Sequence, residues 1–215
     1  GDRPLIVVSQ KPVQWARMTQ NVMMGDIGRG HLNIYRQILE GAKAAKTEWV
    51  ALAEDDILYS EQHFNFQYFC KPEFMSGKYF IYDQNRISIF TWSKPPIFSM
   101  RFKRVVVNSL IAPRLMLIEA MEERFKRLEE LRKIGWEENK ILKFWGDPGR
   151  YEGNLGVTVR PVYEYYAWIP SIVFSHEYAY GYEFNQGKRK KNGDLRIVEL
   201  CDWGRAEDIL KLYKP

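Results

Sequence analysis

Cysteine and long apolar runs are scarce in this sequence, and each absence excludes a class of protein. The 215 residues include two cysteines, Cys70 and Cys201, which form neither a CxxC pair nor a secreted-type disulfide pattern. We therefore expect free thiols, a reducing compartment and no metal–sulfur site. No apolar run approaches the roughly 20 residues that span a bilayer, and the N-terminus lacks the basic-then-apolar order of a signal peptide. These features predict a cytoplasmic protein without a transmembrane segment.

Two familiar nucleotide-binding loops are also missing. The sequence contains no GxxxxGKS/T motif, and no GxGxxG directly follows its first predicted strand. It has instead three glycines in "MGDIGRGHLN", namely Gly25, Gly28 and Gly30, just before a helical pattern. The backbone N–H groups of such a loop and the N-terminus of the following helix favour a phosphate. An ordinary turn that starts a helix would have the same appearance.

The charge of the chain is mildly basic. It carries 32 Lys and Arg against 27 Asp and Glu, a formal net charge of +5 at pH 7. This excess permits a polyanionic partner but does not require one. With 46% hydrophobic residues, a chain of this length can bury one substantial core, so we expect a single domain over residues 1–215.

The first 53 residues follow the order strand, loop, helix, strand. Pro4–Ser9 is a β-branched run typical of a buried strand, and "TEWVALA", Thr47–Ala53, supplies the second strand. Between them, one helical face carries Ile34, Ile38, Ala42 and Ala45. This order predicts an α/β fold with a mostly parallel central sheet, whose ligands lie beyond the carboxyl ends of the strands.

Two further elements are predicted after this region. The aromatic-rich "KYFIYDQNRISIFTW", Lys78–Trp92, indicates an added hairpin with Asp83–Arg86 as its turn. A long amphipathic helix follows, with Pro113 in its first turn. We interpret the charged residues of this helix as a solvated face. Its apolar residues recur at three- and four-residue spacing: Ile111, Leu115, Ile118, Met121, Phe125, Leu128 and Leu131.

Three adjacent carboxylates, Glu54, Asp55 and Asp56, follow the second predicted strand. Like charges this close repel one another, and each resists desolvation, so a cation or hydrogen-bond donors must compensate these charges. Oxygen ligands suit Mg²⁺ or Mn²⁺, which keep positions open for water and substrate phosphates. A solvated acidic turn is the alternative interpretation.

His176 lies within an aromatic-rich stretch, Tyr163–Phe184. A neutral imidazole binds Mn²⁺ well, so His176 is a candidate for a further metal ligand. The alternative is a packed, hydrogen-bonded histidine of the core.

Four short motifs in the N-terminal part of the sequence resemble those of a known protein family. The motifs "SQKP", "GDIG", "RQIL" and "EDD" shortly before "LY" occur in this order between Pro4 and Phe64. In this order they resemble the N-terminal half of a GT-A fold glycosyltransferase, similar to small phage and bacterial family-2-like enzymes. The match extends to about Trp92. Further on, "WIPSIVFSHEYAYG" resembles the segment in which these enzymes place a proline, a short strand and a histidine, although Glu177 and Tyr178 stand where several relatives continue with basic and glycine residues.

The resemblance implies a single Rossmann-like GT-A domain, in which residues 1–92 bind the nucleotide sugar and residues 93–215 form the acceptor side. Asp56 would hold Mn²⁺ or Mg²⁺ with His176, bridging the diphosphate of a nucleotide sugar, with a UDP-sugar as the expected donor. Glu54 would face the nucleoside. The implied donor-binding residues are Gln10, Gly28, Arg29, Gly30, Glu54 and Asp55.

The acceptor side is less defined. If the transfer inverts stereochemistry, a carboxylate must take the acceptor proton, and the candidates are Asp83, Asp147 and Glu177. A basic turn, made of Lys188, Arg189, Lys190 and Lys191, suits a polyanionic acceptor such as DNA carrying a hydroxylated base, which some phage enzymes modify. Lipid-linked and glycan acceptors also use such surfaces, and a solvated loop is the alternative.

Two other functions fit parts of this pattern. A nucleic-acid-binding module without catalysis would explain the net charge, the basic turn and the aromatic run, but not the acidic triplet. A nucleotidyltransferase would use the same metal and carboxylate chemistry. The expected location is the cytoplasm of a bacterium or of a phage-infected host cell, and no feature indicates an oligomeric state.

Overall fold

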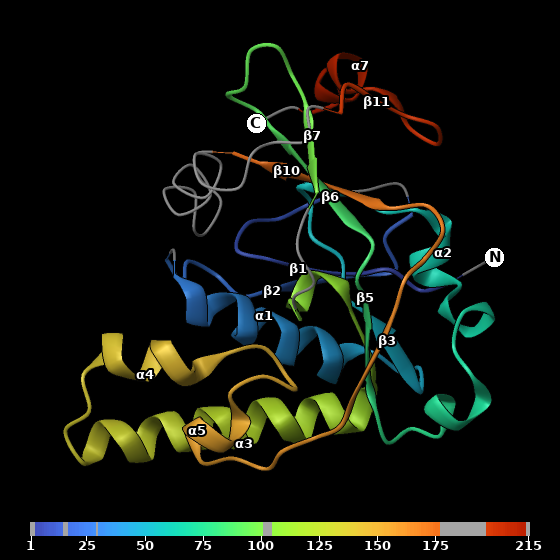
Figure 1. Cartoon of the computed structure of the whole chain (residues 1–215). Helices are drawn as coiled ribbons and strands as arrows, with labels where there is room; N and C mark the ends of the chain where they lie inside the picture. The colour runs from blue at the N-terminus through green and yellow to red at the C-terminus, as the bar shows by residue number, and fades with distance from the viewer. Residues whose placement is uncertain (1–2, 15–16, 29, 101–104, 177–196, 214–215) are drawn as a thin grey trace. The chain divides into compact units, whose positions relative to one another are not determined.

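The computed structural model describes residues 3–14, 17–28, 30–100, 105–176 and 197–213, which form a mixed α/β fold (Figure 1). The chain divides into two compact units, each assembled from three stretches. The first unit comprises Gly1–Leu52, Pro72–Tyr82 and Leu110–Tyr163, and the second comprises Ala53–Lys71, Asp83–Ser109 and Glu164–Pro215. Neither unit coincides with the halves 1–92 and 93–215.

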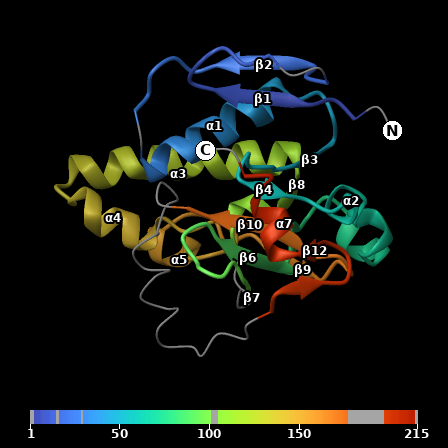
Figure 2. The same ribbon diagram turned by 90° about the horizontal axis from the view of Figure 1, so that it is seen from above.

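The first unit begins with two parallel strands and a helix. Strands β1 (Ile6–Ser9) and β2 (Gln20–Met23) pair in parallel, and α1 (His31–Ala44) lies against β1 (Figure 2). The sequence prediction of a strand ending at Ser9 and of a helix beginning near His31 is confirmed. Strand β2 was not predicted, because it is short and half exposed and so lacks a clear apolar pattern.

A four-stranded sheet belongs mainly to the first unit, with the ends of β5 and β9, from Asp83 and from Glu164, counted in the second. Its order is β3-β8-β5-β9, and β8 pairs antiparallel with both β3 and β5. All four residues of β8 are buried, as expected for an inner strand. The bounds of the four strands are Trp49–Ala51 for β3, Leu110–Pro113 for β8, Phe80–Asp83 for β5 and Val162–Tyr165 for β9.

Helix α3 (Arg114–Lys133) follows β8 directly, and α1 and α4 (Glu138–Trp145) run alongside it (Figure 1). It ends at Lys133, and Gly135 follows two residues later with a φ of 83°, in the left-handed region, and with an N–H that donates to the Arg132 carbonyl oxygen at 3.0 Å. A long helix is thus present as predicted, but Pro113, expected in its first turn, is the last residue of β8 and the N-cap of the helix.

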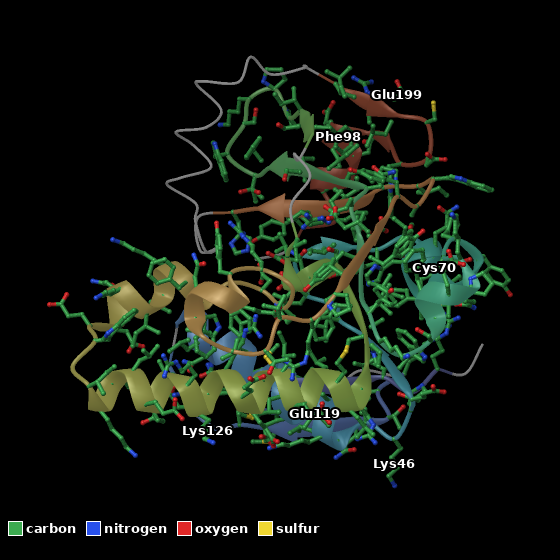
Figure 3. The ribbon with its side chains drawn as sticks, turned by 60° about the horizontal axis from the view of Figure 1, so that its bottom comes forward. Lys46, Cys70, Phe98, Glu119, Lys126 and Glu199 are labelled. Atoms are coloured by element: carbon green, nitrogen blue, oxygen red, sulfur yellow. The ribbon has the colours of Figure 1, made fainter. Side chains whose placement is uncertain are left out.

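The buried face of α3 differs in part from the predicted one. Leu115 is 62% exposed, and Ile111 belongs to β8. Glu119 and Lys126, labelled in Figure 3, are exposed as expected. The buried residues of the helix are Leu117, Ala120, Met121, Arg124, Leu128 and Leu131.

The buried arginine corrects the prediction that the charges of this helix are all solvated. Arg124 Nη2 lies 3.2 Å from Glu152 Oε1 in α5 (Glu152–Leu155) and 3.2 Å from the Asp147 carbonyl oxygen. Glu152 also accepts hydrogen bonds from the backbone N–H groups of Gly149 and Arg160, each at 3.0 Å. A buried charge of this kind requires a partner, and the partner comes from a remote part of the sequence that periodicity cannot identify.

The second unit is built on the sheet β4-β10-β6-β7. Strand β10 pairs in parallel with β6 and antiparallel with β4, while β7 pairs antiparallel with β6. The bounds are Ile57–Leu58 for β4, Ser171–Ser175 for β10, Arg86–Phe90 for β6 and Phe98–Met100 for β7. Short elements complete the unit: α2 (Glu61–Phe64), η1 (Phe66–Tyr68), η3 (Val107–Ser109), β11 (Glu199–Leu200), β12 (Gly204–Arg205) and α7 (Ala206–Leu210).

The core of this unit follows the two-residue period of its strands. Alternate residues of β6 and β10 point to the same face, where α7 covers them. The core residues are Ile87, Ile89, Phe98, Ile172, Phe174, Ala206 and Ile209.

The predicted mostly parallel central sheet is wrong. Among the strand pairings described, only β1 with β2 and β10 with β6 are parallel. The predicted hairpin over Lys78–Trp92 is also wrong, because β5 and β6 belong to different sheets. Both strands exist where the sequence places them, but β5 pairs with β8 and β6 pairs with β10.

Two expectations drawn from composition agree with the structure. Both cysteines are free thiols, Cys70 buried (labelled in Figure 3) and Cys201 exposed. Among the helices that the structure describes, none combines the length and the apolar character needed to cross a membrane.

We predict that Glu152→Gln destabilises the protein strongly, because it removes the carboxylate that neutralises the fully buried charge of Arg124. Breaking one side of a buried pair costs about 3–5 kcal/mol of unfolding free energy, measurable by urea titration. The matched control is Glu130→Gln, which breaks an exposed pair with Arg127 and should cost less than about 1 kcal/mol. Equal losses in the two variants would contradict the structural role of Glu152.

Candidate active site

The acidic triplet and His176 meet through the pairing of two strands. Asp56 immediately precedes β4 and His176 immediately follows β10. In the antiparallel pair, Ile57 lies opposite Val173, and the N–H of Phe174 donates to the Asp56 carbonyl oxygen at 2.9 Å. The register therefore brings together two residues that are 120 positions apart in the sequence.

The two side chains face each other directly. His176 Nε2 lies 3.3 Å from Asp56 Oδ2, and the two side chains are only 17% and 21% exposed. Asp56 Oδ1 is buried and has no hydrogen-bond partner among the described residues. Burial raises the pKa of Asp56, the neighbouring His176 opposes this shift, and the charge of Asp55 adds to it. One oxygen of this partly buried carboxylate is thus desolvated without compensation from the described residues.

Asp56 and His176 are the residues of this group that could hold a divalent cation. Within the described residues, no group of three or more His, Cys, Asp or Glu side chains is placed to hold a metal ion. Mg²⁺ in nucleotide sites is commonly bound through one or two carboxylates, with water and substrate phosphates as the other ligands. Asp56, whose Oδ1 has no partner among the described residues, supplies one carboxylate of this kind, and the nitrogen donor His176 Nε2 lies 3.3 Å from its Oδ2.

Aromatic contacts hold the ring of His176. It stacks on Tyr213 with ring centroids 5.5 Å apart, and Tyr213 also stacks on Phe174 at 5.2 Å. The histidine is therefore both packed and next to a carboxylate, so the two interpretations of the sequence are compatible. Sequence reasoning missed Tyr213, whose only signal was an aromatic residue near the end of the sequence.

A second group of residues surrounds Glu54. Asn108 Nδ2 donates to Glu54 Oε2 at 3.3 Å, and Arg86 Nη1 donates to Asn108 Oδ1 at 3.0 Å. The hydroxyl of Tyr59 contacts the backbone of Glu54 and of Asn108, and burial, followed by the charge of Glu54, raises the pKa of Tyr59. Asp55 is exposed. Sequence reasoning missed Arg86 and Asn108 because no motif contains them, and it gave no role to Tyr59, although Tyr59 belongs to the "LY" that follows the triplet.

The glycine cluster lies in the first unit and is tied together by side-chain amides. Gln10 Nε2 donates to the Gly28 carbonyl oxygen at 3.0 Å, and Gln10 Oε1 accepts from the Ile27 N–H at 3.1 Å. Gly28 has a φ of 70°, a left-handed conformation that favours glycine. Gly30 caps the N-terminus of α1. Gln10 thus shapes the loop whose backbone was predicted to bind the donor, and donor binding itself remains a prediction.

Asp83 lies at the end of β5 and is only 1% exposed. Its Oδ1 accepts from the N–H groups of Asn85 at 3.0 Å and Ala167 at 3.2 Å, and within the described part of the chain its buried Oδ2 has no hydrogen-bond partner. Burial raises the pKa of Asp83 to about 6, against the effect of these hydrogen bonds and of Arg86.

Asp147 belongs to the first unit and is also buried. Its Oδ1 accepts a hydrogen bond of 2.7 Å from the Tyr35 hydroxyl. Burial, followed by the charge of Asp147, raises the pKa of Tyr35. A base that serves an acceptor must reach its hydroxyl, and the burial of Asp83 and Asp147 disfavours both for that role.

Several predicted site residues lie outside the described residues. These are Arg29 of the donor set, Glu177 of the candidate bases, and Lys188, Arg189, Lys190 and Lys191 of the acceptor set. Their roles remain predictions from the sequence.

Comparison of this chain with protein-family models, with curated proteins and with solved structures found no match in any of the three.

We predict that Asp83→Asn changes how stability depends on pH. The folded pKa of about 6 lies above the ordinary 3.8, so the folded state binds the proton more tightly. The bound proton therefore stabilises the folded state. This contribution is complete below pH 3.8 and is lost as the pH rises to about 6, a change of about 3 kcal/mol in the unfolding free energy. Relative to the wild type, the unfolding free energy of the variant should therefore rise by up to this amount between pH 4 and pH 6.

Urea unfolding at several pH values tests this, since other carboxylates titrate equally in both proteins. Parallel curves for wild type and Asp83→Asn would contradict the assignment.

Proposed function

We propose that this chain is a metal-dependent glycosyltransferase that moves a sugar from a nucleotide-sugar donor to an acceptor hydroxyl. The observation that carries the proposal is the contact of 3.3 Å between Asp56 and His176, beside a buried carboxylate oxygen without a partner in the described region. This pair agrees with the roles that the resemblance implies for the two residues.

The arrangement suits a departing diphosphate. Asp56 and His176 would hold Mn²⁺ or Mg²⁺, which supplies charge neutralisation for the leaving nucleoside diphosphate when bound. Glu54 lies two residues from Asp56 and offers a carboxylate oxygen fixed by Asn108. A carboxylate accepts hydrogen bonds from a nucleoside, but it repels a phosphate unless a cation lies between them. In the proposed arrangement Glu54 therefore binds the nucleoside, and Asp56 acts on the diphosphate through the metal ion.

One acceptor that the sequence permits is the hydroxyl of a modified base in DNA, beside lipid-linked and glycan hydroxyls. This step rests on the sequence alone, namely on the net charge of +5 and on the basic turn at 188–191. A UDP-sugar is the proposed donor. Among the candidate bases, Glu177 is retained, because Asp83 and Asp147 are buried.

Thermal stabilisation by nucleotides with Mn²⁺ separates the functions that share parts of this site. Stabilisation by UDP supports glycosyl transfer, and stabilisation by nucleoside triphosphates alone would indicate nucleotidyl transfer. A lack of response to any nucleotide would indicate a binding module and overturn the proposal.

We predict that Asp56→Asn abolishes Mn²⁺-dependent turnover of the nucleotide sugar and weakens Mn²⁺ binding by at least about tenfold, because a ligand and its charge are lost. His176→Ala should weaken the binding of Mn²⁺ and of UDP with Mn²⁺ together. Titration calorimetry measures both affinities. The matched control is Asp208→Asn, which removes an exposed carboxylate of α7 paired with Lys211.

The control should bind Mn²⁺ as the wild type does. Unchanged Mn²⁺ affinity and full turnover in Asp56→Asn would refute the metal assignment.

A further inference from the structure

Asn108 lies between a buried cation and the first carboxylate of the triplet. Its side chain accepts from Arg86 Nη1 at 3.0 Å and donates to Glu54 Oε2 at 3.3 Å. Asn108 is 6% exposed and Arg86 is 4% exposed, so water competes little with either bond. All three residues belong to the second unit.

The orientation of the Asn108 amide follows from the chemistry of its neighbours. A guanidinium only donates hydrogen bonds, so the amide oxygen must face Arg86 and the amide nitrogen must face away from it. The nitrogen is a donor and meets Glu54 Oε2. Hydrogen bonds to a carboxylate are short-range and directional, and they are stronger than neutral ones. Arg86 therefore sets, through Asn108, the direction in which Glu54 is held.

Tyr59 ties the backbone of the same two residues together. Its hydroxyl accepts from the Glu54 N–H at 3.0 Å and donates to the Asn108 carbonyl oxygen at 2.8 Å. Its ring packs against His63, with centroids 4.7 Å apart, and against Phe64 at 5.7 Å. Glu54 is thus fixed to Asn108 by its side chain and by its main chain. Such double attachment lowers the conformational entropy that a binding group loses with its ligand.

We propose that Asn108, supported by Arg86 and Tyr59, is a positioning residue that fixes the Glu54 carboxylate to receive hydrogen-bond donors from the nucleoside of the donor. This inference rests on the proposed function. The donors have two sources in a nucleoside, the ribose hydroxyls and a ring N–H such as that of uracil. A carboxylate suits both sources but rejects a ring nitrogen that carries no proton, as in cytosine.

The test replaces the amide nitrogen with an oxygen. Asn108→Asp keeps an acceptor for Arg86 and sets a second carboxylate against Glu54, which should turn Glu54 away. The dissociation constant for UDP in the presence of Mn²⁺ should rise about tenfold to a hundredfold, while the affinity for Mn²⁺ alone stays unchanged. In turnover, the KM for the nucleotide sugar should rise with little change in kcat.

Two further variants complete the experiment. Gln62→Glu makes the same amide-to-carboxylate change in the same unit, at a side chain whose Oε1 accepts from the Ile169 N–H at 2.9 Å. It should bind UDP as the wild type does. Tyr59→Phe removes the hydroxyl without a change of charge, and it should weaken UDP binding in the same direction, which keeps the test decisive if Asn108→Asp does not fold.

Comparison of UDP, 2′-deoxyuridine diphosphate and CDP in the wild type identifies the source of the donors. Loss of affinity with the deoxy nucleotide assigns Glu54 to the ribose, and loss with CDP assigns it to the base. In Asn108→Asp the affected preference should disappear. Equal affinity of the wild type for all three nucleotides would overturn the inference.

The remaining outcomes separate the inference from the proposed function. If the wild type binds UDP with Mn²⁺ and both Asn108→Asp and Tyr59→Phe bind it equally well, the inference is wrong and the proposed function stands. If Asn108→Asp lost affinity for Mn²⁺ as well as for UDP, the substitution would act on the metal site or on the fold, and the inference would also be overturned. If the wild type binds neither Mn²⁺ nor UDP, both fail.

Discussion

The two-sided pairing of β10 is the constraint on which the second unit depends. One edge of β10 pairs in parallel with β6, and the other pairs antiparallel with β4. Because buried backbone groups must be hydrogen-bonded, the register of both pairs is strongly specified, and it places Ile172 and Phe174 in the core. A slip by one residue would turn these side chains outward and would separate Asp56 from His176.

Two buried arginines of this chain are compensated in different ways. Arg124 in the first unit pairs directly with Glu152, so its contribution is structural. Arg86 in the second unit acts through the amide of Asn108 on Glu54, which is only half buried. Asp56 differs from both, since one of its oxygens is buried with no partner in the described part of the chain. Desolvation without compensation is costly, and a bound cation would relieve that cost.

Local patterns in the sequence located most elements but not their partners. The β-branched run before Ser9 and the helical spacing after Gly30 correspond to β1 and α1. The two arms of the predicted hairpin are strands, yet each joins another sheet, because a strand pattern records burial and says little about which remote segment supplies the hydrogen bonds. The same limit applied to Arg124, which looked like a surface residue in the helical pattern.

The sequence by itself determined the chemistry of the candidate site: three adjacent carboxylates after a strand, and a histidine in an aromatic segment. Only the tertiary structure decided that Asp56 and His176 meet at 3.3 Å, and that Asn108 and Arg86 lie behind Glu54. The reason is physical. The type and spacing of side chains are set by neighbours along the chain, whereas strand register and buried hydrogen bonds are set by contacts between segments far apart in sequence.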